Sequence, residues 1–349
     1  MDKKTLLLAV AACSMIQLHA ENITFSDSKV KALCVQHWDS NKDGELSTDE
    51  AAAVTSLGSV FRGNKTITSF EELRHFTGLA AIDDYAFYQS SLQKVAFPAS
   101  ATSIGEYAFS ESSISGEVRI PGTVKAISDH AFQQCRQLTS VILEEGVETI
   151  GWKSFTGPIG ILSLPSTLTY MSSMAIDPYV SAGSSSGVMI PEGDLYVYVH
   201  STTPPAVHDY AFYYMFTDCH LVVPTGFIEA YKAAYAWSKF GEYLEYGDVN
   251  LDGIVNDSDL SAIVEFISSG ESEFNPLLSD VNFDGVTDAK DVEYLKNYIE
   301  SSTGVNSISL TPVDTRVYTI EGMRLSDKVN ISSLPPGVYI YRGRKFIVK

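Results

Sequence analysis

A six-residue phrase recurs along the middle of this chain at a nearly constant interval. Its copies read IDDYAF from Ile82, IGEYAF from Ile104, ISDHAF from Ile127, IGWKSF from Ile150, MSSMAI from Met171 and VHDYAF from Val207, and the first five stand 22, 23, 23 and 21 residues apart. A period of this length is typical of a solenoid, in which each repeat buries its apolar edge only against its neighbours. We therefore predict a repeat solenoid for the middle of the chain.

The apolar residues of each repeat indicate how a coil is built. Leu92, Val95 and Phe97 precede Pro98 with the spacing of a short strand. The Ala-Phe pairs are expected inside the coil, because the alanine allows close backbone approach while the phenylalanine fills the core. These pairs are Ala86-Phe87, Ala108-Phe109 and Ala131-Phe132.

The repeats lack the L-x-x-L-x-L-x-x-N pattern of the standard leucine-rich repeat. The recurring phrases resemble the BspA-like leucine-rich repeats of bacterial surface proteins, and the segment LVVPTGFIEAYKAAYAWSKF from Leu221 to Phe240 resembles the way such arrays end, with a helix that caps the last repeat. The resemblance implies a solenoid over residues 61–245 that binds proteins of a host or a neighbouring cell. An insertion from Asp177 to Ser201 is either a binding loop or a loop without function.

Three twelve-residue segments share one spacing of oxygen-bearing side chains. They read DSNKDGELSTDE from Asp39, DVNLDGIVNDSD from Asp248 and DVNFDGVTDAKD from Asp280. A calcium ion takes six to eight oxygen ligands, and such a loop surrounds the ion only if the chain turns sharply at position six, where these segments have glycine. The spacing predicts three calcium loops; the alternative is that acidic, glycine-containing turns arise by chance in an acidic chain.

The predicted ligands follow from the loop positions. In the first loop they are Asp39, Asn41, Asp43, Ser47 and Glu50, with the backbone carbonyl of Glu45. In the second they are Asp248, Asn250, Asp252, Asn256 and Asp259, with the carbonyl of Ile254, and in the third Asp280, Asn282, Asp284, Asp288 and Asp291, with the carbonyl of Val286. The first loop is a complete EF-hand loop within a predicted unit at residues 21–60. In the other two, position 12 is an aspartate, one methylene shorter than the usual glutamate.

Amphipathic helices are expected beside these loops, with their apolar stripes packed in the core. The stripes are Val30, Leu33, Cys34 and Trp38 before the first loop, Leu260, Ile263, Val264 and Ile267 after the second, and Val292, Leu295 and Ile299 after the third. Ser47 and Glu50 predict a capping box at the helix after the first loop.

The segments GDVNLDGIVNDSDL and SDVNFDGVTDAKDV, with aspartate at position 12, resemble a type I dockerin. That resemblance implies a small calcium-folded domain at residues 246–302 that attaches the chain to a cohesin domain on another protein. In dockerins the partner is read at loop positions 10 and 11, which here are Asp257 and Ser258 in one loop but Ala289 and Lys290 in the other. Because the two pairs differ, a symmetric, interchangeable docking mode is not expected.

The two ends of the chain resemble export signals of different kinds. Residues 1–20 have the lysines, the apolar run and the small final residue of a secretory signal peptide, while Val10-Ala11-Ala12-Cys13 also resembles a lipobox in which Cys13 would be acylated. VYTIEGMRLS and LPPGVYIYRGRKFIVK resemble the C-terminal tails of proteins exported by type IX secretion, and residues 303–349 predict a short β-module. We therefore expect a secreted protein or one on the outer surface of a bacterium, with no transmembrane segment.

Composition excludes some classes of partner and linkage. The formal net charge of −19 argues against nucleic acid, because binding phosphates requires a basic patch. Cys34, Cys135 and Cys219, left after removal of the signal, do not indicate a disulfide framework.

No catalytic motif has a fitting context. Ser185 lies in a G-x-S-x-G match inside a low-complexity loop, whereas that motif requires a strand before the serine and a helix after it. The histidines are dispersed, and the acidic pairs Asp83-Asp84 and Glu144-Glu145 are expected to be solvated. We expect no enzymatic activity.

The sequence thus predicts a multidomain chain: an α EF-hand unit, a β-rich leucine-rich-repeat solenoid, a small α calcium-binding dockerin-like domain and a short C-terminal β-module. The expected function is a calcium-binding adhesion and protein-interaction protein at the cell surface, which the dockerin-like domain attaches to a cohesin-like domain. The alternative is a non-catalytic or carbohydrate-binding component of a polysaccharide-degrading assembly.

Overall fold

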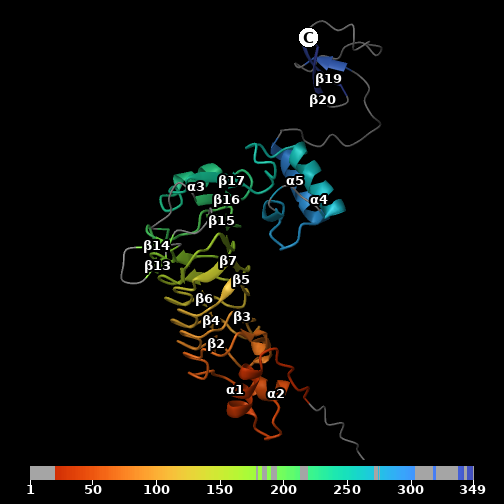
Figure 1. Cartoon of the computed structure of the whole chain (residues 1–349). Coiled ribbons are helices and arrows are strands. Elements are labelled where there is room, and N and C mark those ends of the chain that lie inside the picture. Colours follow the sequence, from red (N-terminus) through yellow and green to blue (C-terminus); the bar gives the residue numbers. More distant parts are fainter. Residues whose placement is uncertain are drawn as a thin grey trace, which may run out of the picture.

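The computed structural model shows an elongated stack of coils with helices at both ends (Figure 1). It describes residues 20–177, 180–182, 187–189, 195–212, 219–270, 274, 276–302, 317–319, 337–341 and 344–348. The predicted signal peptide with Cys13, the Ser185 motif and most of the C-terminal tail lie outside the described residues.

One parallel sheet follows the recurring phrase from coil to coil. Its strands are β2 (Ala81–Ile82), β4 (Ser103–Ile104), β6 (Ala126–Ile127), β8 (Thr149–Ile150) and β11 (Tyr170–Met171). The register pairs the first residue of each phrase with the next, from Ile82 to Met171, and a bridge joins Met171 to Val207. The solenoid prediction is confirmed.

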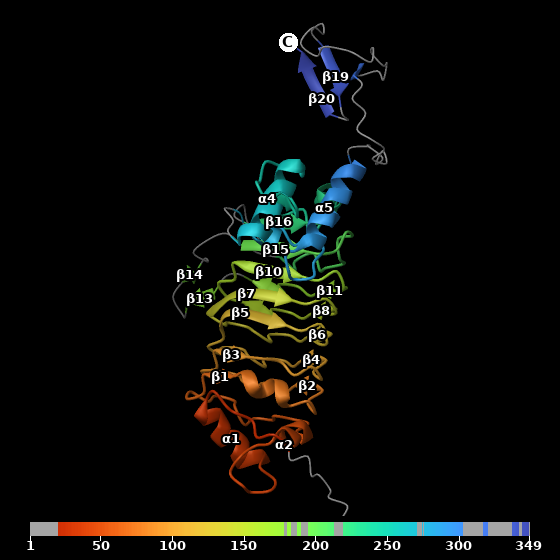
Figure 2. The same ribbon diagram turned by 90° about the vertical axis from the view of Figure 1, so that its right-hand side faces the viewer.

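A second, broader parallel sheet runs along another side of the stack (Figure 2). In spatial order its strands are β5 (Ser115–Ile120), β7 (Gln137–Leu143), β10 (Ile161–Leu164), β15 (Leu195–Val199), β16 (Cys219–Val223) and β17 (Glu242–Glu245). Smaller pairings join β1 (Ser69–Phe70) to β3 (Lys94–Val95), β9 (Phe155–Thr156) to β12 (Ile176–Asp177), and β13 (Val180–Ala182) antiparallel to β14 (Gly187–Met189).

A column of phenylalanine rings fills the inside of the coils. The rings of Phe61, Phe87, Phe109, Phe132 and Phe155 stack in sequence with centroids 5.3, 5.0, 4.9 and 5.2 Å apart. The alanine before each ring in the first three repeats is fully buried, as predicted, and the backbone passes close enough for Phe109 N to donate to Ala131 O at 2.8 Å. Ring stacking and the backbone hydrogen bonds between neighbouring coils therefore repeat with the same period.

The N-terminal unit extends the solenoid core instead of forming a separate one. Helices α1 (Ser28–Trp38) and α2 (Thr48–Ala53) and the 3-10 helix η1 (Glu71–His75) lie at the first coil. Val30 and Cys34 of α1 are buried in the same apolar cluster as the repeats, and Leu33 and Trp38 pack against that cluster. The Ser47–Glu50 capping box is present at the start of α2.

The other end of the solenoid differs in part from the expectation. Helix α3 (Ile228–Ala233) buries Tyr231, and the turns after it bury Trp237, but Tyr235 is 64% exposed and β17 adds a further strand beyond Phe240. The array therefore does not end at the helix.

Two longer helices follow, α4 (Asp257–Ser269) and α5 (Ala289–Ser302), with the 3-10 helix η2 (Pro276–Leu278) between them. Ile263 and Leu295 are buried, as predicted, whereas Val264 and Ile267 are 46% and 41% exposed. The prediction that these two side chains pack in the core is therefore wrong.

Beyond these helices, the described strands β18 (Val317–Thr319), β19 (Gly337–Tyr341) and β20 (Arg344–Val348) pair antiparallel in that order. The sorting role of this tail stays a prediction. In the described part of the chain, no helix combines the length and the apolar character that crossing a membrane requires.

Candidate functional site

The three predicted calcium loops adopt the same backbone conformation. At position 4 of each loop a non-glycine residue has a left-handed φ: 64° at Lys42, 58° at Leu251 and 64° at Phe283. At position 6 the glycines have φ values of 85°, 81° and 86°. Few other residues adopt this conformation without strain, so the glycine makes the sharp turn that the sequence predicted.

The side chains at positions 1, 3 and 5 all turn toward the inside of the loop. The first aspartate accepts a hydrogen bond from the N–H of the position 6 glycine, at 2.9 Å in all three loops. The Oδ1 atom of the position 3 asparagine accepts from the N–H of position 5, at 2.8, 2.9 and 2.8 Å. Position 5 accepts from the N–H of position 7, at 2.8, 2.9 and 3.1 Å. The loops are therefore preorganised with their oxygen atoms turned inward.

The carboxylate at position 12 closes each loop. One Glu50 oxygen accepts from Ser40 N and Asn41 N, and the other accepts from Ser47 N at 3.0 Å. Likewise, one Asp259 oxygen accepts from Val249 N and Asn250 N, and the other accepts from Asn256 N. One Asp291 oxygen accepts from Asn282 N, and the other accepts from Asp288 N. Asp259 and Asp291 are both 0% exposed. The shorter aspartate thus makes the same kind of contacts as the longer glutamate.

The two C-terminal loops hold their carboxylates in an unfavourable electrostatic environment. Burial raises the pKa of Asp248, and the neighbouring Asp259 carboxylate raises it further. Burial likewise raises the pKa of Asp280, to which Asp291 and Asp284 add repulsion. A divalent cation among these oxygens would relieve the repulsion.

The first loop differs in its electrostatics. Burial alone would raise the pKa of Glu50, but the hydrogen bonds from Ser47, Ser40 and Asn41 lower this pKa to about 2. Glu50 is therefore ionised at neutral pH, as a ligand carboxylate must be.

The donor sets consist of oxygen atoms alone, which fits a hard cation such as calcium. Within the described ranges, no group of three or more His, Cys, Asp or Glu side chains is placed to hold a metal. The calcium assignment therefore depends on mixed sets of carboxylate, amide, hydroxyl and carbonyl oxygens.

The four residues predicted to read a partner are all exposed. Asp257 and Ser258 open α4, where the Asn256 side chain accepts a hydrogen bond from Ser258 N at 2.8 Å. Ala289 and Lys290 open α5, but the Lys290 ammonium lies 3.0 Å from an oxygen of Asp284. The first pair presents an acidic surface and the second a cation that is held by a loop carboxylate, so the two faces differ as predicted.

The helical module packs against the outer face of the broad sheet. Tyr198, Val222 and Tyr246 of the solenoid share one apolar cluster with Ile263 and Leu295 of the helices. Sequence reasoning missed this interface. The available signal was the continuous apolar run of β15, LYVYV, because such a strand is covered on both faces.

Phe283 of the third loop makes the most specific contact across this interface. Its ring stacks on the His200 imidazole with centroids 4.5 Å apart and planes within 3°, and it meets the Tyr246 ring edge-on at 4.7 Å. Phe283 lies between the predicted ligands Asn282 and Asp284. The conformation of the third loop is therefore linked to the attachment of the module.

We expect Phe283→Ala to destabilise the module interface by about 1–3 kcal/mol, because it removes two aromatic pairs worth about 0.5–1.5 kcal/mol each. Limited proteolysis should then cut between the solenoid and α4 more rapidly. The matched control is Leu251→Ala, since Leu251 occupies the same position in the second loop but is 56% exposed. Equal proteolysis of the two variants would contradict the role of Phe283.

Comparison with family models identifies both central modules. Residues 60–178 match the BspA type leucine-rich repeat region in six copies. Residues 246–300 match the dockerin type I domain. Both are typical of extracellular or cell-surface proteins, and a dockerin implies a cohesin partner. A search of curated proteins found no match to this chain. The repeat match ends before the Val207 phrase. The broad parallel sheet nevertheless continues to β17, the strand that directly precedes the dockerin match.

Proposed function

We propose that this chain is a calcium-binding interaction protein at the cell surface, attached by its dockerin region to a cohesin-like domain. The observation that carries the proposal is the shared frame of the three loops, in which the same positions turn oxygens inward and position 12 closes the ring. The dockerin match at residues 246–300 supports the attachment role.

Calcium has a structural role in this proposal. The two dockerin loops pack into one cluster with Val249, Val281 and the helices, so an ion that relieves the carboxylate repulsion also stabilises that cluster. Extracellular calcium modules have Kd values on the order of 10⁻⁴ to 10⁻³ M, which suits an exported protein. The first loop, at the opposite end of the solenoid, is proposed as an EF-hand-type site of the same kind (Figure 1).

The solenoid is proposed to present a binding surface while the dockerin region anchors it. The dockerin region packs on the broad sheet at strands β10, β15, β16 and the end of β17, and the coils nearer the N-terminal unit lie away from it (Figure 2). Adhesion to a protein of a host or neighbouring cell remains the expectation from the repeat resemblance. Membership of a polysaccharide-degrading assembly remains the alternative, and neither comparison supports a carbohydrate ligand.

The attachment is tested by binding of the full chain to a panel of purified cohesin domains in calcium and in chelator. We expect binding in calcium alone, and we expect Asp257→Lys to weaken it at least about tenfold, because reversing a charge at an interface costs more than one kcal/mol. Asp49→Lys is the control, since Asp49 is also an exposed acidic residue beside a loop but lies in the N-terminal unit. Binding that persists in chelator, or that both variants weaken equally, would contradict the proposal.

A further inference from the structure

A groove of about 680 Å³ lies between the dockerin region and the uncovered part of the broad sheet. Ile142, Ser163 and Tyr198 line it from the sheet, while Phe266, Leu277 and Phe283 line it from the dockerin region. The lining is thus mixed: beside these apolar and aromatic side chains stand the polar or charged side chains of Arg119, Glu144, Glu145, Ser163, His200, Asp280, Asp284 and Thr287.

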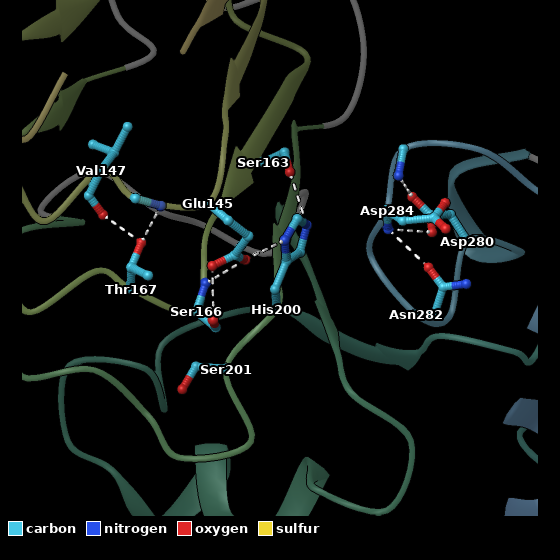
Figure 3. A network of polar contacts seen from close by, with 12 residues as sticks. Glu145, Val147, Ser163, Ser166, Thr167, His200, Ser201, Asp280, Asn282 and Asp284 are labelled. Atoms are coloured by element: carbon cyan, nitrogen blue, oxygen red, sulfur yellow. Dashed lines mark hydrogen bonds and ion pairs between the residues drawn. The ribbon is translucent and has the colours of Figure 1, made fainter. Parts of the chain in front are cut away.

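Three of the polar side chains in this groove form a continuous hydrogen-bonded chain (Figure 3). Ser163 Oγ lies 3.0 Å from His200 Nε2, and His200 Nδ1 lies 3.1 Å from Glu145 Oε1. The three residues come from separate coils, at strand β10, at the end of strand β15 and at the turn after strand β7. Folding therefore places a hydroxyl, an imidazole and a carboxylate in the order that nucleophilic catalysis requires.

The carboxylate is fixed from several sides. Glu145 accepts hydrogen bonds from Ser166 N at 2.8 Å and Ser166 Oγ at 2.7 Å, in addition to the contact with His200. Its backbone carbonyl is so close to Gly122 that a Cβ on that glycine would overlap it. Although burial opposes it, the hydrogen bonds from His200 and Ser166 lower the pKa of Glu145 to about 2. The sequence predicted a solvated Glu145, whereas in the structure this carboxylate is ionised and fixed by hydrogen bonds.

An ionised carboxylate only accepts hydrogen bonds, so the hydrogen on the neutral imidazole belongs on Nδ1. Nε2 is then free to accept from the Ser163 hydroxyl. The stack of His200 on Phe283 and its edge contact with Tyr246, at 6.1 Å between centroids, hold the ring in this orientation. Each member of the chain is thus oriented by the next.

We propose that Ser163, His200 and Glu145 form a hydrolytic triad that cleaves a carboxylic ester bound in the groove. Ser163 Oγ attacks the ester carbonyl carbon while its proton passes to His200 Nε2. The bond to the alcohol oxygen breaks, that oxygen takes the proton, and the acyl group remains on Oγ. A water molecule then gives a proton to Nε2 and attacks the acyl carbon, and Oγ recovers its proton as the acid leaves. The net reaction is ester plus water to acid plus alcohol.

Arg119 is the group that fits the charge developing on the ester oxygen. Of the groove-lining residues that the structure describes, it is the one with a Lys or Arg side chain. Arg119 pairs in register with Ile142, and Ile142 pairs with Ser163 on the next strand. Because neighbouring strands lie about 4.8 Å apart, about 10 Å separates the backbones of Arg119 and Ser163. An arginine side chain can largely bridge that distance. Its exposed pair with Glu117, at 3.3 Å, is of a kind that contributes little. The apolar part of the lining, with Ile142, Phe266 and Leu277, favours an aliphatic or aromatic acyl group, and the carboxylates of the lining disfavour an anionic ester.

This inference goes beyond the proposed function and does not depend on a cohesin partner. It is tested on the full chain in calcium, with para-nitrophenyl acetate and butyrate as substrates and a fluorophosphonate as a covalent label. We expect hydrolysis above the buffer rate and one fluorophosphonate adduct that peptide mass mapping assigns to Ser163. Ser163→Ala should remove the adduct and lower the rate at least ~100-fold.

Two further variants separate catalysis from structure. Ser140→Ala removes a hydroxyl from the neighbouring strand outside the groove lining and should retain both the rate and the adduct. Glu145→Gln should lower kcat with little change in KM, because it leaves the ligand surface intact but favours the wrong imidazole tautomer. Unfolding temperatures check that each variant is folded. Absence of an adduct on Ser163, or hydrolysis that Ser163→Ala does not reduce, would overturn the triad and leave the network as a structural contact between modules.

Discussion

Phe109→Ala should destabilise the solenoid by about 3–5 kcal/mol, the usual cost of removing a buried phenylalanine ring. Phe109 is 0% exposed and stacks on Phe87 at 5.0 Å and Phe132 at 4.9 Å, so its loss opens a cavity between two coils. Each coil of a solenoid is stabilised only by its neighbours, so the damage uncouples the two halves of the array. We expect the unfolding temperature, followed by circular dichroism, to fall by roughly 6–20 °C.

Two variants control this result. Phe109→Leu keeps most of the apolar volume and should cost less than the alanine. Tyr170→Ala removes an aromatic ring of similar size that is 46% exposed on β11, and it should change the unfolding temperature little. An equal loss from Phe109→Ala and Tyr170→Ala would show that the ring column does not hold the coils together.

The repeat period was enough to predict the solenoid, because it is set by a backbone constraint. In each of the first five phrases the first residue ends a short strand, and the Ala-Phe pairs of the first three lie inside the coil, so the spacing of a few residues determines both sheet register and core. The conformation of the three twelve-residue loops was predictable for a similar reason, since local geometry fixes the position 6 glycine and the positions of the oxygen-bearing side chains. Both features depend on residues close together in the sequence.

The module interface and the groove were not predictable from such local patterns. Ser163, His200 and Glu145 meet only because adjacent coils stack, and His200 lies within the insertion from Asp177 to Ser201, where the repeat period does not predict its position. Val264 and Ile267 fit a core stripe in the sequence, yet α4 packs through another part of its surface. Which face of a helix is covered depends on the partner surface, here the outer face of the sheet from β10 to β17.

Chelation of calcium should destabilise the dockerin region by about 5 kcal/mol relative to calcium at roughly 100 times Kd, because each of two filled loops contributes about 2.7 kcal/mol at that concentration. For a Kd on the order of 10⁻⁴ M, that concentration is about 10 mM. The ions bind the folded loops in preference to the unfolded chain, so they raise the unfolding temperature. Differential scanning calorimetry of the full chain in calcium and in chelator measures the difference.

Asp280→Asn distinguishes ion binding from a general charge effect. The asparagine keeps an oxygen that can accept from Gly285 N but loses the negative charge, so about half of the calcium-dependent shift should disappear. In chelator the same variant should be neutral or slightly stabilising, because burial and the carboxylates of Asp291 and Asp284 make an ionised Asp280 unfavourable there. Glu293→Gln removes one exposed charge from α5 and should leave the calcium dependence intact. An ion that binds the folded loops must raise the unfolding temperature. The same unfolding temperature in calcium and in chelator would therefore contradict the calcium assignment.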